Sequence, residues 1–128
     1  MNIRDELKSR IIDPFPKVIE CDIGWDGLLY DLHDKLVAVD PNYTLFQVKE
    51  KFGGLRFYYS ASDPTLDQIF RSIVMFYEKL SLSVCEMTGE RGSLMVKSGF
   101  YKTLAESFLH DGWTKVDVTV NLPRPLEG

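Results

Sequence analysis

The chain has 128 residues, of which 45% are hydrophobic and 27% are charged, and this composition excludes a largely disordered chain. The net charge of −4 argues against general binding to duplex DNA and is neutral toward a basic protein partner. Neither a membrane-spanning apolar run nor a signal-peptide pattern is visible, so we expect a soluble, cytoplasmic protein.

The first predicted element is a short helix that Asn2 caps and that extends to about Ser9. Acidic residues lie in its first turn, where the helix dipole favours them. Residues 13–16 contain two prolines and end the helix, because residues before proline avoid the helical region. Residues 17–22 alternate weakly and predict a short edge strand.

A second helix is predicted over roughly Asp26–Val39. Apolar residues recur there at steps of three or four, as on one helix face: Trp25, Leu28, Leu29, Leu32, Leu36 and Val39. His33 lies close in sequence to Asp31 and Asp34, a combination that could suggest a metal site or a proton relay. Side chains at adjacent helix positions point in different directions, however, and do not converge on one site. We therefore expect His33 to be exposed to solvent.

The densest pattern is a β-hairpin, in which two apolar-rich runs flank Gly53-Gly54. If these glycines form the turn, Glu50 faces Phe57 across the strands. One face then holds Phe46, Val48, Phe52, Leu55, Phe57 and Tyr59, and the other holds Gln47, Lys49, Lys51, Arg56, Tyr58 and Ser60. The first face predicts core. Since a buried carboxylate needs a partner, either Glu50 lies at the edge of that core or the register is off by one.

A third helix is predicted from Pro64 to about Leu80, because Asp63-Pro64 combines a capping side chain with proline at the first helical position. Its apolar face is expected to cover the hairpin: Leu66, Ile69, Phe70, Ile73, Phe76, Tyr77 and Leu80.

The C-terminal third has weaker patterns. Residues 83–97 predict a tight knuckle turn, residues 99–109 a moderate helix, and residues 113–120 a strand that extends the hairpin's sheet. Residues 121–128 predict a flexible tail. Together the elements predict one α+β domain over residues 1–120, with a small antiparallel sheet built on the hairpin and helices mainly on one face.

The hairpin sequence VKEKFGGLRFY, residues 48–58, resembles the signature of small, uncharacterised proteins of phages, prophages and bacteria. The resemblance extends to Gly24-Trp25, to residues 85–89 and to residues 99–104, and it spans roughly residues 18–105. It names no activity, so it implies a scaffold rather than a function.

Many members of this family carry a Cys-x-x-Cys-Gly knuckle and a later Thr-Leu-Cys, as if to hold zinc. Here Cys85 keeps the first position, but Thr88 and Ala105 replace the other two cysteines. Zinc needs about four good ligands. The resemblance therefore implies a knuckle without metal, held by apolar packing around Met87, Leu94 and Phe100.

The sequence offers little catalytic chemistry, and we predict neither an enzyme nor a cofactor. Cys21 and Cys85 fit free thiols, although spacing alone leaves a disulfide open, and Cys85 is expected to be an inert core residue. An acidic region formed by Glu20, Asp22 and Asp26 beside Trp25 has the residue types for acid–base work or magnesium. A solvated rim is the favoured interpretation.

We therefore expect a non-catalytic protein-binding or inhibitory protein of phage or bacterial origin, such as an immunity protein or host-takeover factor. Its partner would be a host or cognate protein. Two contact surfaces are candidates: the acidic region of Glu20, Asp22, Trp25 and Asp26, and a basic strip of Lys49, Lys51, Arg56 and Tyr58. The alternative is a nucleic-acid accessory protein that uses the basic strip for phosphate contacts and base stacking.

Overall fold

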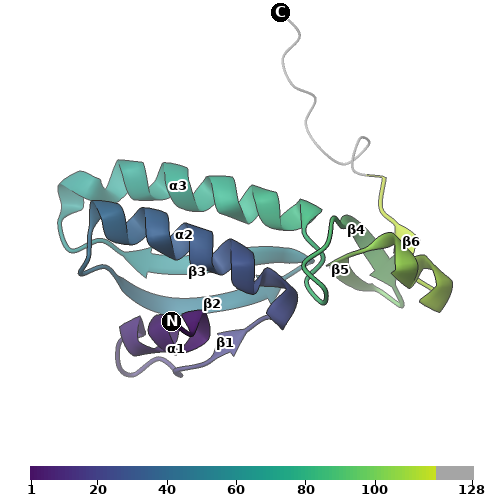
Figure 1. Cartoon of the computed structure of the whole chain (residues 1–128), viewed down its shortest axis with the longest axis horizontal. Helices are drawn as coiled ribbons and strands as arrows, with labels where there is room; N and C mark the ends of the chain where they lie inside the picture. Colours follow the sequence, from purple (N-terminus) through teal and green to yellow (C-terminus); the bar gives the residue numbers. More distant parts are fainter. Residues whose placement is uncertain (118–128) are drawn as a thin grey trace, which may run out of the picture.

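Two three-stranded sheets organise the chain, and three helices pack against the first sheet (Figure 1). A computed structural model describes residues 1–117. The elements are α1 (Ile3–Arg10), β1 (Ile19–Glu20), α2 (Asp26–Val39), β2 (Thr44–Lys51), β3 (Gly54–Ser60), α3 (Asp67–Leu80), β4 (Ser93–Lys97), β5 (Phe100–Leu104) and β6 (Thr114–Lys115). The first sheet has the order β1-β2-β3 and the second has the order β5-β4-β6. The predicted α+β class is confirmed.

The N-terminal elements match the sequence predictions closely. The Asn2 side chain accepts hydrogen bonds from the backbone N–H groups of Arg4 and Asp5 and caps α1. The short edge strand is β1, which runs parallel to β2 with Ile19 opposite Val48. The second helix, α2, has the predicted bounds, and its leucines are buried in the main core.

The hairpin forms, but its turn lies one residue earlier than predicted, at Phe52-Gly53. Both residues have positive φ, 53° and 86°, as a two-residue primed turn requires. Glu50 consequently faces Leu55 instead of Phe57. Because the pairing moves by two positions, side chains near the turn keep their predicted faces.

Two predicted core residues of the hairpin are displaced from the core. Phe52 lies in the turn with 66% of its surface exposed. A bulge between Leu45 and Gln47 buries Leu45 in place of Phe46, whose ring packs edge-on against Phe15 instead. Both differences come from local backbone irregularities that strict alternation cannot anticipate.

Helices α2 and α3 lie side by side across one face of the first sheet, whereas α1 lies beside β1 and β2 (Figure 1). Asp63 caps the 3-10 turn that leads into α3, as predicted. The buried stripe of α3 is Phe70, Val74 and Tyr77. The prediction was wrong for Ile69, Phe76 and Leu80, which are exposed, because the small sheet covers only part of the wide apolar arc of this helix.

The outer edge of β3 is closed by side chains that follow it in sequence. The backbone N–H of Leu55 donates to Ser81 Oγ at 2.9 Å, and that of Phe57 donates to Glu78 Oε2 at 2.9 Å. Burial raises the pKa of Glu78, although the Phe57 hydrogen bond and the Arg56 charge oppose this. These contacts occupy donors that an edge strand would otherwise offer to another chain.

The C-terminal third differs most from its prediction. Strand β4 occupies the end of the predicted knuckle, and the predicted helix over residues 99–109 is instead β5 followed by a 3-10 helix, Glu106–Asp111. The last strand, β6, pairs with β4 and does not join the hairpin's sheet. These elements enclose a second, smaller core of Cys85, Met95, Leu104 and Ala105, against which the partly buried Phe108 and Trp113 pack.

Within residues 1–117, none of the helices has both the length and the apolar character needed to cross a membrane. The predicted tail, and the last three residues of the predicted strand 113–120, lie outside the described residues. The predicted domain boundary at residue 120 therefore stays a prediction.

Candidate functional site

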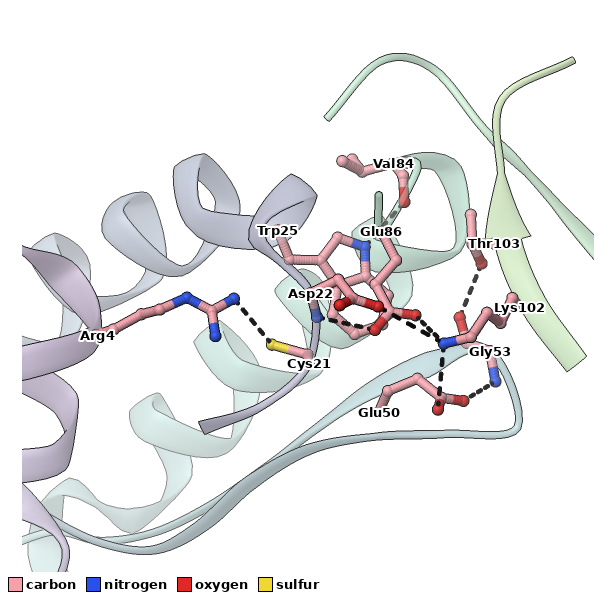
Figure 2. Close-up of polar contacts among 10 residues, drawn as sticks. All are labelled: Arg4, Cys21, Asp22, Trp25, Glu50, Gly53, Val84, Glu86, Lys102 and Thr103. Atoms are coloured by element: carbon pink, nitrogen blue, oxygen red, sulfur yellow. Dashed lines mark hydrogen bonds and ion pairs between the residues drawn. The ribbon is translucent and has the colours of Figure 1, made fainter. Parts of the chain in front are cut away.

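A polar junction lies beside the hairpin turn, where four separate stretches of the chain meet (Figure 2). Its side chains are Asp22 before α2, Glu50 at the end of β2, Glu86 in the knuckle and Lys102 on β5. These stretches are far apart in sequence, so the junction fixes the hairpin turn against the C-terminal third.

Lys102 holds the junction together. Its ammonium lies 2.9 Å from Glu86 Oε1, 3.9 Å from Glu50 Oε1 and 4.0 Å from Asp22 Oδ2. Partial burial alone would lower the pKa of Lys102, but the Glu86 hydrogen bond and the three carboxylates outweigh it and raise that pKa. Lys102 therefore stays charged at neutral pH.

Glu86 is almost completely buried and has partners for both of its oxygens. Oε1 accepts from Lys102, and Oε2 accepts from the backbone N–H of Asp22 at 3.0 Å. Within residues 1–117, no buried side-chain nitrogen or oxygen is left without a hydrogen bond. The junction is thus a closed structural brace rather than an open reaction centre.

Close backbone contacts tighten the same region. The N–H of Gly24 donates to the Glu86 carbonyl at 2.7 Å, and a Cβ at Gly24 would clash with that oxygen. The indole of Trp25 donates to the Val84 carbonyl at 2.8 Å. On the other side, the Thr103 hydroxyl donates to the Gly53 carbonyl at 2.8 Å. Only glycine fits at position 24.

The knuckle brings Cys85, Thr88 and Ala105 together. Burial alone would raise the pKa of Cys85, but hydrogen bonds from Thr88 and from the backbone of Ala105 and Met87 lower it. Thr88 and Ala105 present a hydroxyl and a methyl group beside Cys85, and neither is a usual zinc ligand. Among residues 1–117, no three His, Cys, Asp or Glu side chains gather as a metal site would require.

The packing of this knuckle corrects the prediction. Met87 and Phe100, which were expected to fill it, are both exposed. Met95 and Leu104 are buried against Cys85 instead. The strand alternation of β4 and β5 determines this choice, because it points these two side chains inward.

The acidic region does not form a free surface. Trp25 is completely buried, so the structure contradicts its predicted place on a contact surface. Asp26 pairs with Arg4 at 2.8 Å, and Asp22 lies near Lys102. Glu20 is exposed and accepts a hydrogen bond from Gln47 at 3.3 Å. These carboxylates therefore turn toward different neighbours and do not converge.

His33 is also a correction, because it is only 5% exposed rather than facing solvent. It follows Leu29 by four positions and precedes Leu36 by three, so it shares their flank, against which α1 packs. Its Nδ1 lies 2.6 Å from the Tyr43 hydroxyl, and its Nε2 lies 3.7 Å from Glu6. Burial and the Arg10 charge lower the pKa of His33, although the Glu6 and Asp34 charges oppose this, which favours the neutral ring at pH 7.

The two cysteines are free thiols. Burial raises the pKa of Cys21 to about 12, although the nearby Arg4 opposes this. The Cys21 thiol is thus protonated at neutral pH and is a poor nucleophile. Cys85 is completely buried, as expected for a core residue.

The basic strip is assembled as predicted on one face of the hairpin. Lys49 directly faces Arg56 across β2 and β3, Lys51 faces Gly54, and Tyr58 faces Gln47. This face is opposite to the one that carries the buried pair Val48 and Phe57. Two like charges that face each other across a sheet disfavour folding, although Glu20 of β1 lies opposite Lys49 on its other side.

A groove of about 340 Å³ lies between the hairpin turn, β3, the C-terminal half of α3 and the start of β4. We call it the tip groove. Its apolar lining comprises Phe52, Met75, Leu82 and Leu94, together with Gly54 and Leu55, and its charged lining comprises Lys51, Arg56, Lys79 and Glu78. Met75 is 48% exposed there.

The three cations of the tip groove are not held in ion pairs with residues 1–117, although the Lys51 ammonium lies 5.6 Å from the centroid of the Phe52 ring and the Arg56 charge acts on Glu78. Within the described part of the chain, neither Lys51, Arg56 nor Lys79 has a carboxylate at ion-pair distance. The one carboxylate of the groove, Glu78, already accepts the Phe57 N–H. A positive, partly apolar hollow thus exists on a chain whose net charge is −4.

Only part of this groove is predicted by the sequence. Lys51 and Arg56 belong to the predicted basic strip, whereas no binding function was predicted for Met75, Lys79 or Leu82. The available indication was the spacing of Met75 and Lys79, four residues apart on the side of α3 away from its predicted apolar face.

No known protein family, curated protein or solved structure matches this chain.

Proposed function

We propose that this protein is a non-catalytic binding protein that inhibits or neutralises a partner protein, as an immunity protein or a phage host-takeover factor does. The observation that carries the proposal is the tip groove, where exposed apolar side chains and unpaired cations meet. Large apolar groups surrounded by charge are typical of protein-binding surfaces.

Phe52 gives independent support. It is a bulky residue at positive φ, a backbone conformation that an L-residue of this kind rarely adopts. It is also 66% exposed, so burial does not compensate for this conformation. Strained, exposed residues gather at sites of function, and this one lines the tip groove.

Site-specific photo-crosslinking in nuclease-treated lysate of the source organism tests the proposal. A photoreactive residue at Met75 is expected to attach to one dominant protein. Phe76 is the matched control, since it is the next residue on α3, is 61% exposed and does not line the groove. If position 75 yields no protein adduct above the position 76 control, the proposed function is wrong.

The basic strip supports a second candidate, a nucleic-acid accessory protein, because Lys49 and Arg56 sit directly opposite each other beside an exposed Tyr58. Phosphates would neutralise the paired cations, and a base would stack on the tyrosine. Lys49 and Tyr58 do not line the tip groove, so the double variant Lys49→Glu, Tyr58→Ala separates the candidates. Loss of low-salt retention on single-stranded DNA or RNA in this variant would favour the second candidate.

A further inference from the structure

The side chains that line the tip groove indicate which kind of partner segment would bind there. This inference rests on the proposed function, because it describes what occupies the same groove. Four apolar side chains, Phe52, Met75, Leu82 and Leu94, offer contacts to apolar groups. The three cations beside them, Lys51, Arg56 and Lys79, favour carboxylates.

The backbone of the groove excludes one common way of binding. β3 is an edge strand, and a partner strand would ordinarily pair with its outward N–H groups. Here the N–H of Leu55 donates to Ser81 and that of Phe57 donates to Glu78. Strand addition would have to break both bonds, so an occupant must dock through its side chains.

A helix suits these conditions. An amphipathic helix presents apolar side chains at three- and four-residue steps and keeps its own backbone hydrogen-bonded. Acidic residues that flank the apolar stripe would reach the cations of the groove wall. We propose that the tip groove binds an amphipathic helix of the partner protein whose apolar stripe is flanked by aspartate or glutamate.

A displayed library of helical peptides tests this directly. Each peptide has an alanine-rich background, with stripe positions that vary between leucine, methionine and serine and flanking positions that vary between glutamate, lysine and glutamine. Selection on the immobilised full-length chain is expected to enrich leucine or methionine in the stripe and glutamate beside it. Enrichment of lysine, no stripe preference or no enrichment at all would overturn the inference.

Variants of the chain locate the binding. The selected peptide is expected to bind Met75→Glu at least tenfold more weakly, and Phe76→Glu within twofold of the original chain. Lys79→Glu is expected to shift the preference from glutamate-flanked toward lysine-flanked peptides, whereas Lys35→Glu on the exposed surface of α2 leaves it unchanged. Equal losses in Met75→Glu and Phe76→Glu would place the peptide elsewhere and overturn the inference.

Two further results keep this inference distinct from the proposed function. If the crosslink from position 75 maps to a protein segment that is not an acidic helix, the inference fails and the proposed function stands. If the chain alone dimerises and Met75→Glu makes it monomeric, the groove receives a second copy and the inference fails. Absence of any protein adduct at position 75 removes the proposed function itself.

Discussion

The polar junction and the tip groove both border the hairpin turn, but their charged side chains differ in whether they are paired. At the junction, Lys102 meets three carboxylates, and the buried Glu86 has partners for both oxygens. In the groove, Lys51, Arg56 and Lys79 have no ion-pair partner among residues 1–117. The contrast separates charge that holds the fold from charge that is free to bind.

The largest effect is expected from Gly24→Ala on the junction side. The new Cβ would clash with the carbonyl oxygens of Glu86 and Cys85, so backbone atoms would have to shift. We expect the free energy of unfolding to fall by about 2–4 kcal/mol. Gly27→Ala is the matched control, because nothing lies within 4 Å of that Cβ. Chemical denaturation of both variants measures the difference, and equal stabilities would contradict the close contact.

Lys102→Met tests the buried ion pair against an exposed one. Lys102–Glu86 and Lys115–Glu106 have the same separation, 2.9 Å, but only Glu86 is buried. Removing the cation leaves a buried carboxylate without its counter-charge, so the free energy of unfolding should fall. We expect a decrease of only about 2 kcal/mol, because Lys102 is itself partly exposed. Lys115→Met should leave the denaturation midpoint unchanged. Similar losses in both variants would show that burial does not distinguish the pairs.

Phe52→Asn is expected to act in the opposite direction on the groove side. Asparagine tolerates positive φ far better than phenylalanine, so this variant should gain about 0.5–1 kcal/mol of stability. Loss of the exposed ring should weaken binding of the partner at least about tenfold. Denaturation and binding measurements on one preparation give both quantities. A variant that is more stable and binds equally well would remove Phe52 from the binding surface.

The sequence predicted the N-terminal part of the fold because its determinants are local. Asn2 caps α1, Asp63 caps the turn into α3, and the leucines of α2 repeat along one face. The second sheet was not predicted, because its core depends on Met95 and Leu104. These two side chains become buried together only when β4 and β5 pair. Residues 99–109 have a helical spacing, but the turn at Ser98-Gly99, where both residues have positive φ, makes a hairpin instead.

The candidate site was predictable to the extent that it lies on one element. The basic strip alternates along the hairpin, so its cations could be assigned to one face from the sequence. The tip groove needs Met75 and Lys79 of α3 beside the edge of β3, and no local pattern contains that contact. Trp25 shows the opposite error, since its neighbouring carboxylates suggested a surface although the indole completes the core.

The smallest expected effect concerns Glu78, which borders the groove and closes the edge of β3. Burial raises its pKa above the ordinary value of 4.5, so the ionised form opposes folding. This penalty is fully present above the folded-state pKa and disappears as the pH falls below the unfolded-state value. Glu78→Gln retains an oxygen for the Phe57 N–H and has no charge to bury.

The Glu78→Gln variant should therefore be slightly more stable than the original chain at pH 7, and this advantage should disappear near pH 4. Denaturation midpoints of both proteins at the two pH values measure it. The same change makes the groove more positive, so it should also tighten binding of a glutamate-flanked peptide. A stability advantage that is the same at both pH values would mean that the amide helps through packing and that the charge of Glu78 does not oppose folding. Unchanged or weaker binding of the glutamate-flanked peptide would mean that this charge does not oppose binding.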